Sequence, residues 1–178
     1  MTERNRVYLC LAHMSDAGIE QQYIKEAFET NWVVPLGPNV NGFEADLQEF
    51  VGQNKRIVAL SSGTAAVHLA LIACGVKPGD EVCVQSFTFC ASSHPITYLG
   101  ATPVFIDSEK DTWNMDPELL EEAIKDRIVK TGKKPKAIVP VALYGMPYRI
   151  DRIMEIADRY GISVVEDAAE GFGSKYKG

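Results

Sequence analysis

The sequence is poor in cysteine and histidine, and neither residue is placed as a metal site or a disulfide framework would require. Its 178 residues include 4 cysteines and 3 histidines. The cysteines form no C-x-x-C pair, and the three histidines are widely scattered along the chain. We therefore expect buried, reduced thiols and neither a metal site nor a disulfide scaffold.

Long apolar runs and excess positive charge are also missing. The longest nearly uncharged apolar stretch, residues 137–146, is too short to span a bilayer, and no apolar signal-peptide segment follows the polar residues 1–6. With 18 basic and 24 acidic residues, the net charge of −6 argues against duplex DNA or a membrane surface as partner. The 46% hydrophobic and 24% charged composition is typical of a globular domain, which we expect to be cytoplasmic.

Residues 1–52 are predicted to form a helical arm. Suitable capping residues, Ser15 and Asp16, precede apolar residues at helical spacing: Ile19, Tyr23, Ala27 and Phe28. Two prolines and a glycine predict an irregular loop over residues 35–39. The spacing of Phe43, Leu47 and Phe50 indicates a second helix that ends at Gly52.

Residues 53–178 alternate between two kinds of segment. Apolar runs rich in β-branched residues predict strands at 56–60, 81–86, 102–107, 137–141 and 163–166. Helical segments are predicted at 65–74, 91–99, 117–129 and 150–160. Glycines at positions 75, 100 and 161 mark the ends of three of these helices, and Asp116-Pro117-Glu118 marks the start of one. This alternation predicts a three-layer αβα fold with a mainly parallel sheet.

The carboxyl ends of parallel strands are where ligands bind in such folds, so we inspected the residues after each predicted strand. The segment Ser61-Ser62-Gly63-Thr64 opens a helix, where free backbone amides and the helix dipole favour a phosphate. The alternative is an ordinary serine cap, and the Walker A pattern of nucleotide triphosphatases is absent.

Two further strand ends carry groups that suit a ring-shaped ligand. Phe87 and Phe89 follow the second predicted strand and offer aromatic faces, although core packing is the usual role of a phenylalanine. Asp167 follows the last strand, where a carboxylate needs a cation such as a protonated ring nitrogen, a nearby Arg or Lys, or else water. Phosphate cradle, aromatic face and carboxylate together predict a pyridoxal 5′-phosphate (PLP) pocket.

The same segments resemble, in order, motifs of the DegT/DnrJ/EryC1/StrS family of PLP-dependent sugar aminotransferases of fold type I. The matching segments are residues 62–71 (SGTAAVHLAL), 79–82 (GDEV), 87–89 (FTF), 100–105 (GATPVF) and 166–170 (EDAAE). Residues 13–15 (HMS) and 35–40 (PLGPNV) are similar to enzymes that aminate UDP-linked 4-keto-6-deoxy sugars of the bacillosamine type. The resemblance implies that residues 53–178 form part of the PLP-binding large domain, with residues 1–52 as an arm and substrate-side loop.

The resemblance also implies a role for individual residues. Gly63, Thr64 and Ala65 would lie at the cofactor phosphate, and Phe89 would stack on the pyridine ring. Asp167 would pair with the ring nitrogen, and Glu170 falls where many relatives carry His or Gln near the phenolic oxygen. A carboxylate there would repel a phenolate unless it were protonated or paired. On the sugar-nucleotide side, His13 and Trp32 are candidates for substrate contact, with a packing role as the alternative.

The main departure from the family is that this chain lacks the lysine that forms a Schiff base with the cofactor. In the family it lies beyond the segment that matches residues 166–178, so it is not in this chain, and we expect an N-terminal portion that is inactive alone. In the family's sheet, the first strand is separated in space from the others by two strands that come after the lysine in sequence. We therefore also expect a gap in the sheet of this chain.

The resemblance implies a homodimer that moves an amino group, with glutamate as the expected donor, to a nucleotide-linked keto sugar in polysaccharide or lipopolysaccharide synthesis. One alternative is a PLP-dependent sugar dehydratase of the same family, with histidine in place of the lysine. Another is a non-enzymatic nucleotide-sugar or regulatory binding module. A nicotinamide-binding domain is disfavoured, because Gly171-Phe172-Gly173 lacks the third spaced glycine and follows the last strand.

Overall fold

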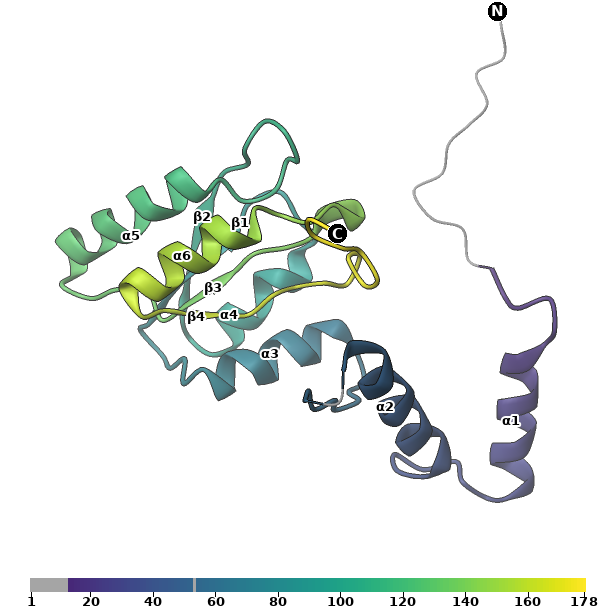
Figure 1. The fold of residues 1–178 in the computed structure, drawn as a ribbon. Helices are drawn as coiled ribbons and strands as arrows, with labels where there is room; N and C mark the ends of the chain where they lie inside the picture. The colour runs from purple at the N-terminus through teal and green to yellow at the C-terminus, as the bar shows by residue number, and fades with distance from the viewer. Residues whose placement is uncertain (1–12, 53) are drawn as a thin grey trace, which may run out of the picture. The chain divides into compact units, whose positions relative to one another are not determined.

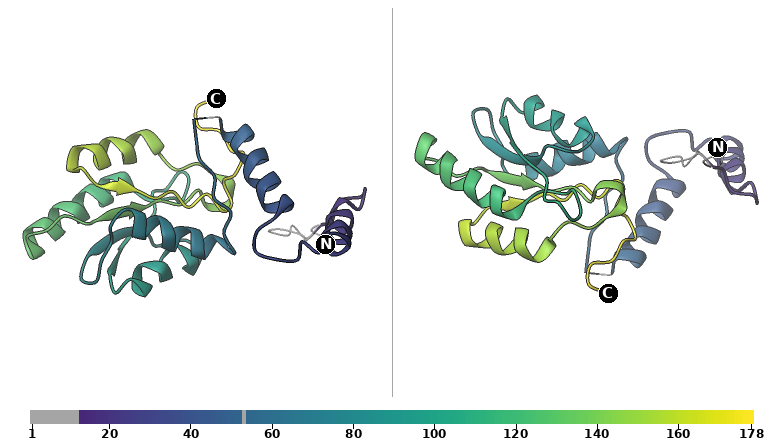
Figure 2. Two further views of the ribbon diagram at one scale, coloured as in Figure 1. Left: turned by 90° about the horizontal axis from the view of Figure 1, so that it is seen from below. Right: turned by 90° about the horizontal axis from the view of Figure 1, so that it is seen from above.

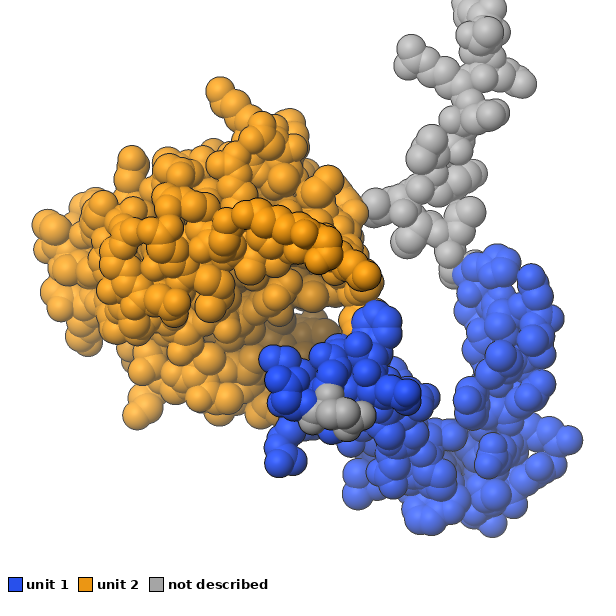
Figure 3. All heavy atoms as spheres, in the orientation of Figure 1, with its two compact units in different colours: residues 1–59 blue, residues 60–178 orange. Residues whose placement is uncertain are grey.

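The computed structural model describes residues 13–52 and 54–178, so Cys10 and the first residues discussed above lie outside it. The chain divides into two compact units, residues 1–59 and 60–178 (Figure 1, Figure 3). The two units are described separately below. Within the described part of the chain, no helix combines the length and the apolar character that crossing a membrane would need.

The first unit contains two helices, α1 (Ile19–Glu29) and α2 (Pro38–Val51). At the start of α1, the Ser15 hydroxyl accepts a hydrogen bond from the Ile19 amide at 2.9 Å and donates one to Glu20 at 2.6 Å. The predicted cap at Ser15 and Asp16 is therefore wrong, because the N-cap residue is Gly18, which provides no side-chain cap, and Ser15 contacts the first turn from three residues before Gly18. Neither helix buries any of its residues.

The predicted loop over residues 35–39 is wrong at its end, because α2 already begins at Pro38. Proline lacks an amide hydrogen and has a fixed φ, and both properties suit the first position of a helix. The preceding Gly37 has φ of 150°, and a Cβ there would lie 3.0 Å from the Trp32 ring. The predicted end of the second helix at Gly52 is confirmed.

The second unit is built on a four-stranded parallel sheet in the order β2-β1-β3-β4. Its strands are β1 (Glu81–Gln85), β2 (Thr102–Ile106), β3 (Ala137–Val139) and β4 (Ser163–Val164). An isolated parallel bridge between Val141 and Asp167 continues the pairing of β3 and β4 toward their carboxyl ends. All the strands therefore end at one edge of the sheet.

Helices cover both faces of this sheet (Figure 1, Figure 2). On one face lie α3 (Gly63–Ala73), the 3-10 helix η1 (Cys90–Ser92) and α4 (His94–Tyr98). On the other lie α5 (Pro117–Thr131) and α6 (Ile150–Tyr160). Side chains of β1 point alternately to the two faces: Val82 and Val84 belong to the core under α3 and α4, and Cys83 belongs to the core under α5 and α6. The predicted three-layer αβα fold is confirmed.

Local signals explain the helix boundaries of this unit. The Asp116 carboxylate accepts hydrogen bonds from the amides of Glu118 at 2.8 Å and Leu119 at 3.1 Å, as the predicted cap requires. The glycines predicted to end helices, at positions 75, 100 and 161, all have positive φ. The predicted helix 91–99 is divided into η1 and α4, with Ser93 between them.

The predicted first strand, residues 56–60, is wrong. This segment pairs with no strand in the described residues, although Ala59 donates its amide to the Glu44 carboxylate at 2.7 Å. A strand is defined by ladder hydrogen bonds to a neighbour. The segment 56–60 has no such neighbour among the described residues, so this apolar sequence forms no strand.

Candidate functional site

A cleft of about 300 Å³ opens at the carboxyl edge of the sheet, within the second unit. It is lined by Gly63, Thr64, Thr88, Phe89, Ala91, Val141, Asp167, Ala169 and Glu170. These residues come from the start of α3 and from the segments that follow β1, β3 and β4. The volume lies at the lower end of the range for small-molecule sites, about 300–1,000 Å³.

One end of the cleft is the first turn of α3. Ser62 caps this helix, accepting hydrogen bonds from the Ala65 amide through its hydroxyl at 3.2 Å and from the Ala66 amide through its carbonyl at 3.0 Å. The preceding amides, those of Gly63 and Thr64, have no protein acceptor among the described residues. A Cβ added at Gly63 would meet no atom within 4 Å. This end therefore offers free donors, the positive end of a helix dipole and open space.

The Asp167 carboxylate lines the same cleft and is half-buried. Its backbone is fixed by two hydrogen bonds to the segment after β3, one to the Pro140 carbonyl at 3.0 Å and one from the Ala142 amide at 3.2 Å. Its side chain accepts hydrogen bonds from the Ser92 hydroxyl at 2.6 Å and from the Ala169 amide at 3.2 Å. No Lys or Arg of the described residues pairs with this carboxylate, so its negative charge is available to a cationic ligand.

Phe89 and Glu170 complete the lining. The Phe89 side chain is 75% exposed, which rules out the core-packing alternative in the described unit and leaves its face free. Glu170 accepts a hydrogen bond from the Tyr144 amide at 2.6 Å. Tyr144 has a left-handed backbone with φ of 54°, so its amide is turned toward this carboxylate by an uncommon conformation. This neutral amide orients one oxygen of Glu170 but brings no positive charge, so it does not offset the repulsion expected from the sequence position of Glu170.

Close packing holds the segments after β3 and β4 together beneath the cleft. A Cβ added at Gly171 would lie 2.6 Å from the Cβ of Ala142, a distance that only glycine allows. The Ser174 hydroxyl also donates to the Gly145 carbonyl at 2.7 Å. Glycine is therefore required at position 171 because two chain segments approach each other there.

Two fully buried amide side chains connect the segments of this edge. Gln85 donates to the Phe87 carbonyl at 2.9 Å and to the Asn114 side-chain oxygen at 3.3 Å, and it accepts from the Met115 amide at 2.8 Å. Asn114 accepts from the Leu143 amide at 3.0 Å and donates to the Met146 carbonyl at 2.9 Å. Sequence reasoning missed both residues: Gln85 is a polar residue at the end of an apolar strand, and Asn114 is a loop residue with no distinctive sequence signal.

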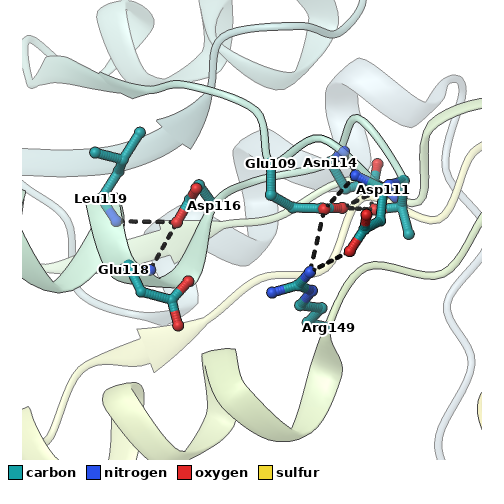
Figure 4. Close-up of polar contacts among 8 residues, drawn as sticks. Glu109, Asp111, Asn114, Asp116, Glu118, Leu119 and Arg149 are labelled. Atoms are coloured by element: carbon teal, nitrogen blue, oxygen red, sulfur yellow. Dashed lines mark hydrogen bonds and ion pairs between the residues drawn. The ribbon is translucent and has the colours of Figure 1, made fainter.

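The loop that carries Asn114 is itself held by a buried carboxylate, as Figure 4 shows. Glu109 accepts hydrogen bonds from the amides of Asp111 at 2.7 Å and Thr112 at 2.8 Å and from the Thr112 hydroxyl, and Arg149 lies 3.4 Å away. Burial alone would raise the pKa of Glu109, but these hydrogen bonds and the Arg149 charge together hold the pKa below its usual value. The loop is therefore rigidly attached to the sheet edge.

The structure brings most of the predicted site residues together, with three exceptions. Gly63, Thr64, Phe89, Asp167 and Glu170 all line the cleft, whereas Ala65 does not and its amide is bound to Ser62. His13 and Trp32 belong to the first unit, which is described by itself, so their roles stay predictions.

Comparison with known proteins was made with the whole chain. Residues 15–178 match the DegT/DnrJ/EryC1/StrS aminotransferase family. The chain is 53% identical over 173 residues to "Putative pyridoxal phosphate-dependent aminotransferase EpsN" of Bacillus subtilis (strain 168), covering 97% of this chain and 44% of that protein. It is 43% identical over 168 residues to UDP-2-acetamido-2-deoxy-3-oxo-D-glucuronate aminotransferase of Pseudomonas aeruginosa, covering 92% and 42%.

Solved structures agree with these matches. The X-ray structure of the aminotransferase from Psychrobacter cryohalolentis superposes with a TM-score of 0.80 at 34% identity, covering 93% of this chain and 40% of that one. The chain thus spans less than half the length of the curated relatives and solved structures that it matches.

Proposed function

The chain belongs to the DegT/DnrJ/EryC1/StrS aminotransferase family, and from this premise we propose that its cleft binds the cofactor of a PLP-dependent sugar aminotransferase. The observation that carries the proposal is the set of groups that line one cleft: the free amides of Gly63 and Thr64, the exposed side chain of Phe89, and the Asp167 carboxylate.

These groups fit the cofactor chemically. The Gly63 and Thr64 amides at a helix N-terminus, with open space before them, suit a phosphate dianion. The free face of Phe89 suits a pyridine ring, because aromatic rings stack face to face with an offset. Asp167, which has no cationic partner among the described residues, suits a protonated ring nitrogen. PLP when bound would supply an electron sink for the amino acid's Cα.

Each residue then has a separate task. The α3 amides bind the phosphate and fix the position of the ring. Phe89 covers one face of the ring and excludes water from it. Asp167 would hold the proton on the ring nitrogen through its negative charge, and electrostatic stabilisation of this kind is worth several kcal/mol where water is excluded. Because Glu170 is paired with the Tyr144 amide, we assign it to holding the edge of the cleft.

We further propose that the substrate is a nucleotide-linked keto sugar of the UDP-4-keto-6-deoxy type and that glutamate is the amino donor. The names of two similar proteins support a nucleotide-linked sugar as the coarser substrate class: the P. aeruginosa aminotransferase above is named for a UDP-linked 3-oxo sugar, and the GDP-perosamine synthase of Escherichia coli O157:H7, at 40% identity, for a GDP-linked sugar. The Schiff-base lysine is expected outside these 178 residues, so activity is proposed for a protein that carries this chain together with that lysine.

A homodimer is also proposed, with the first unit as part of the contact. The apolar side chains of its loop are all more than half exposed: Trp32 51%, Val33 59%, Val34 52% and Leu36 72%. None of the residues described in this unit, 13–52 and 54–59, is buried, so they form no core of their own. Contiguous exposed apolar side chains of this kind are typical of protein contacts.

An isotope-transfer assay tests the proposed activity. The protein that contains this chain is mixed with PLP, [15N]glutamate and a UDP-linked 4-keto-6-deoxy sugar, and the nucleotide sugar is analysed by mass spectrometry. The proposal predicts that 15N enters the sugar. Loss of water from the sugar without gain of 15N would indicate the dehydratase, and sugar binding without any need for PLP would indicate the binding module.

A further inference from the structure

Asp167 is contacted by a serine that lies 75 residues earlier in the chain. Ser92, at the end of η1, is fully buried, and its hydroxyl donates to Asp167 Oδ2 at 2.6 Å. The Thr88 hydroxyl lies 3.1 Å from Ser92 Oγ. Two hydroxyl groups and a carboxylate are therefore in series, from the segment after β1 to the segment after β4.

The donors in this series can be assigned. An ionised carboxylate only accepts hydrogen bonds, so the Ser92 proton must point to Asp167. Ser92 then has only lone pairs to offer Thr88, and the Thr88 hydroxyl donates to Ser92 Oγ. The other carboxylate oxygen, Asp167 Oδ1, accepts from the Ala169 amide at 3.2 Å. Both oxygens of Asp167 are thus oriented by donors of the protein itself.

We propose that Ser92, supported by Thr88, is a positioning residue that fixes the Asp167 carboxylate toward the cleft. The inference rests on the proposed function, because it assigns Asp167 to the ring nitrogen of the cofactor. Hydrogen bonds to a carboxylate are short and directional, so the Ser92 hydroxyl and the Ala169 amide restrict the orientation of Asp167. A carboxylate held close to a ring nitrogen favours the proton there, and this attraction weakens with distance. Without Ser92, the carboxylate can turn away and part of that attraction is lost.

A double-mutant cycle on ligand binding tests this role. The probe is pyridoxamine 5′-phosphate, which has no aldehyde and so does not react with surface lysines. Its affinity for the 178-residue chain is measured by calorimetry for the wild type, Ser92→Ala, Asp167→Asn and the double variant. We expect Ser92→Ala to weaken binding roughly tenfold, within the usual range of coupling between contacting residues, because the Asp167 carboxylate is no longer held toward the cleft. In the Asp167→Asn background, we expect the same change to have an effect of less than about twofold, since Ser92 acts through Asp167.

Two further measurements separate positioning from simple structural support. The matched control is Ser93→Ala, because the Ser93 hydroxyl contacts the Cys90 carbonyl at 3.2 Å and not Asp167, and it should leave affinity unchanged. The ultraviolet spectrum of the bound probe reports the proton on its ring nitrogen, and Ser92→Ala should lower the pH at which that proton is lost. Ser92→Thr, which keeps the hydroxyl, should restore the wild-type midpoint.

Each result decides the matter. The inference is supported if Ser92→Ala weakens binding only when Asp167 is present and also lowers the pH at which the ring nitrogen of the probe loses its proton. Equal effects of Ser92→Ala in both backgrounds, or an unchanged midpoint in the folded variant, would overturn it while leaving the proposed cofactor cleft intact. Failure of the wild-type chain to bind the probe would remove the proposed cleft and this inference with it. Urea unfolding of each variant confirms that the comparison is made between folded proteins.

Discussion

Replacing Asn114 with leucine should destabilise the carboxyl edge of the sheet more than any surface change. The Asn114 side chain is fully buried and makes three hydrogen bonds: from the Leu143 amide, from Gln85 and to the Met146 carbonyl. Leucine has a similar size but can make none of them. The partners stay in place, because they belong to the backbone of neighbouring segments or to a side chain of β1.

The size of the effect follows from the groups left without a partner. Gln85 keeps its hydrogen bond to the Phe87 carbonyl, so its loss is partial. The Leu143 amide and the Met146 carbonyl lose a side-chain partner inside the protein, and each such group costs about 1–3 kcal/mol. Burial of the apolar leucine side chain offsets part of this loss of stability. We therefore expect the free energy of unfolding to fall by about 2–4 kcal/mol, which is large against a typical total of about 5–15 kcal/mol.

Urea unfolding followed by tryptophan fluorescence measures this change. Trp113 adjoins the mutated residue, and a Trp32→Phe background removes the signal of the first unit. The control is Glu122→Leu, an exposed position on α5 that undergoes a polar-to-leucine change and should stay within about 0.5 kcal/mol of the wild type. If Asn114→Leu proved as mild as this control, the buried amide network would not hold the cleft's edge and the reasoning would be refuted.

Three other predictions follow from the site and its surroundings. In the protein that contains this chain, Asp167→Asn should keep much of its PLP but lose amino transfer by orders of magnitude. The reason is that Asn removes the negative charge opposite the ring nitrogen but leaves phosphate binding and ring stacking unchanged. Near-normal turnover would contradict the pyridinium role. Burial raises the pKa of Cys83 to about 12, so at pH 8 iodoacetamide should label the exposed Cys90 long before Cys83, as peptide mass mapping would show. The hydrogen bond from Lys177 holds the pKa of Asp151 at about 2, so this contact stabilises the folded chain above about pH 4 and is lost as pH falls toward 2. Hydrogen exchange of the C-terminal residues should therefore become faster as the pH falls through this range. In the Asp151→Asn variant, this acid-dependent increase should be absent.

Most of the fold of the second unit could be read from its sequence because its signals are local. Helix caps such as Asp116 and terminal glycines such as Gly161 act within a few residues, and buried parallel strands are continuous apolar runs. The segment 56–60 has the same apolar character yet forms no strand, because strand formation depends on a neighbour that a short sequence window does not contain. Pro38 was misjudged because a proline ends a helix in its interior but suits its first turn.

The candidate site was predictable where chemistry is concentrated at a helix start, as at Gly63 and Thr64, or after a strand, as at Asp167. It was not predictable where a residue acts through partners far away in the sequence. Gln85 and Asn114 are common polar residues, and only the folded chain shows that they connect three loops. The pairing of Glu170 with the Tyr144 amide likewise depends on a left-handed backbone at Tyr144, which no residue preference predicts for a tyrosine.

A crystal structure of the chain with pyridoxamine 5′-phosphate tests the central claim most directly, because it locates every group of the ligand at once. The account predicts that the phosphate lies within hydrogen-bond distance of the Gly63 and Thr64 amides, the ring against Phe89 and the ring nitrogen at the Asp167 carboxylate. A ligand bound in the opposite direction, or bound elsewhere while this cleft holds only water, would contradict the account.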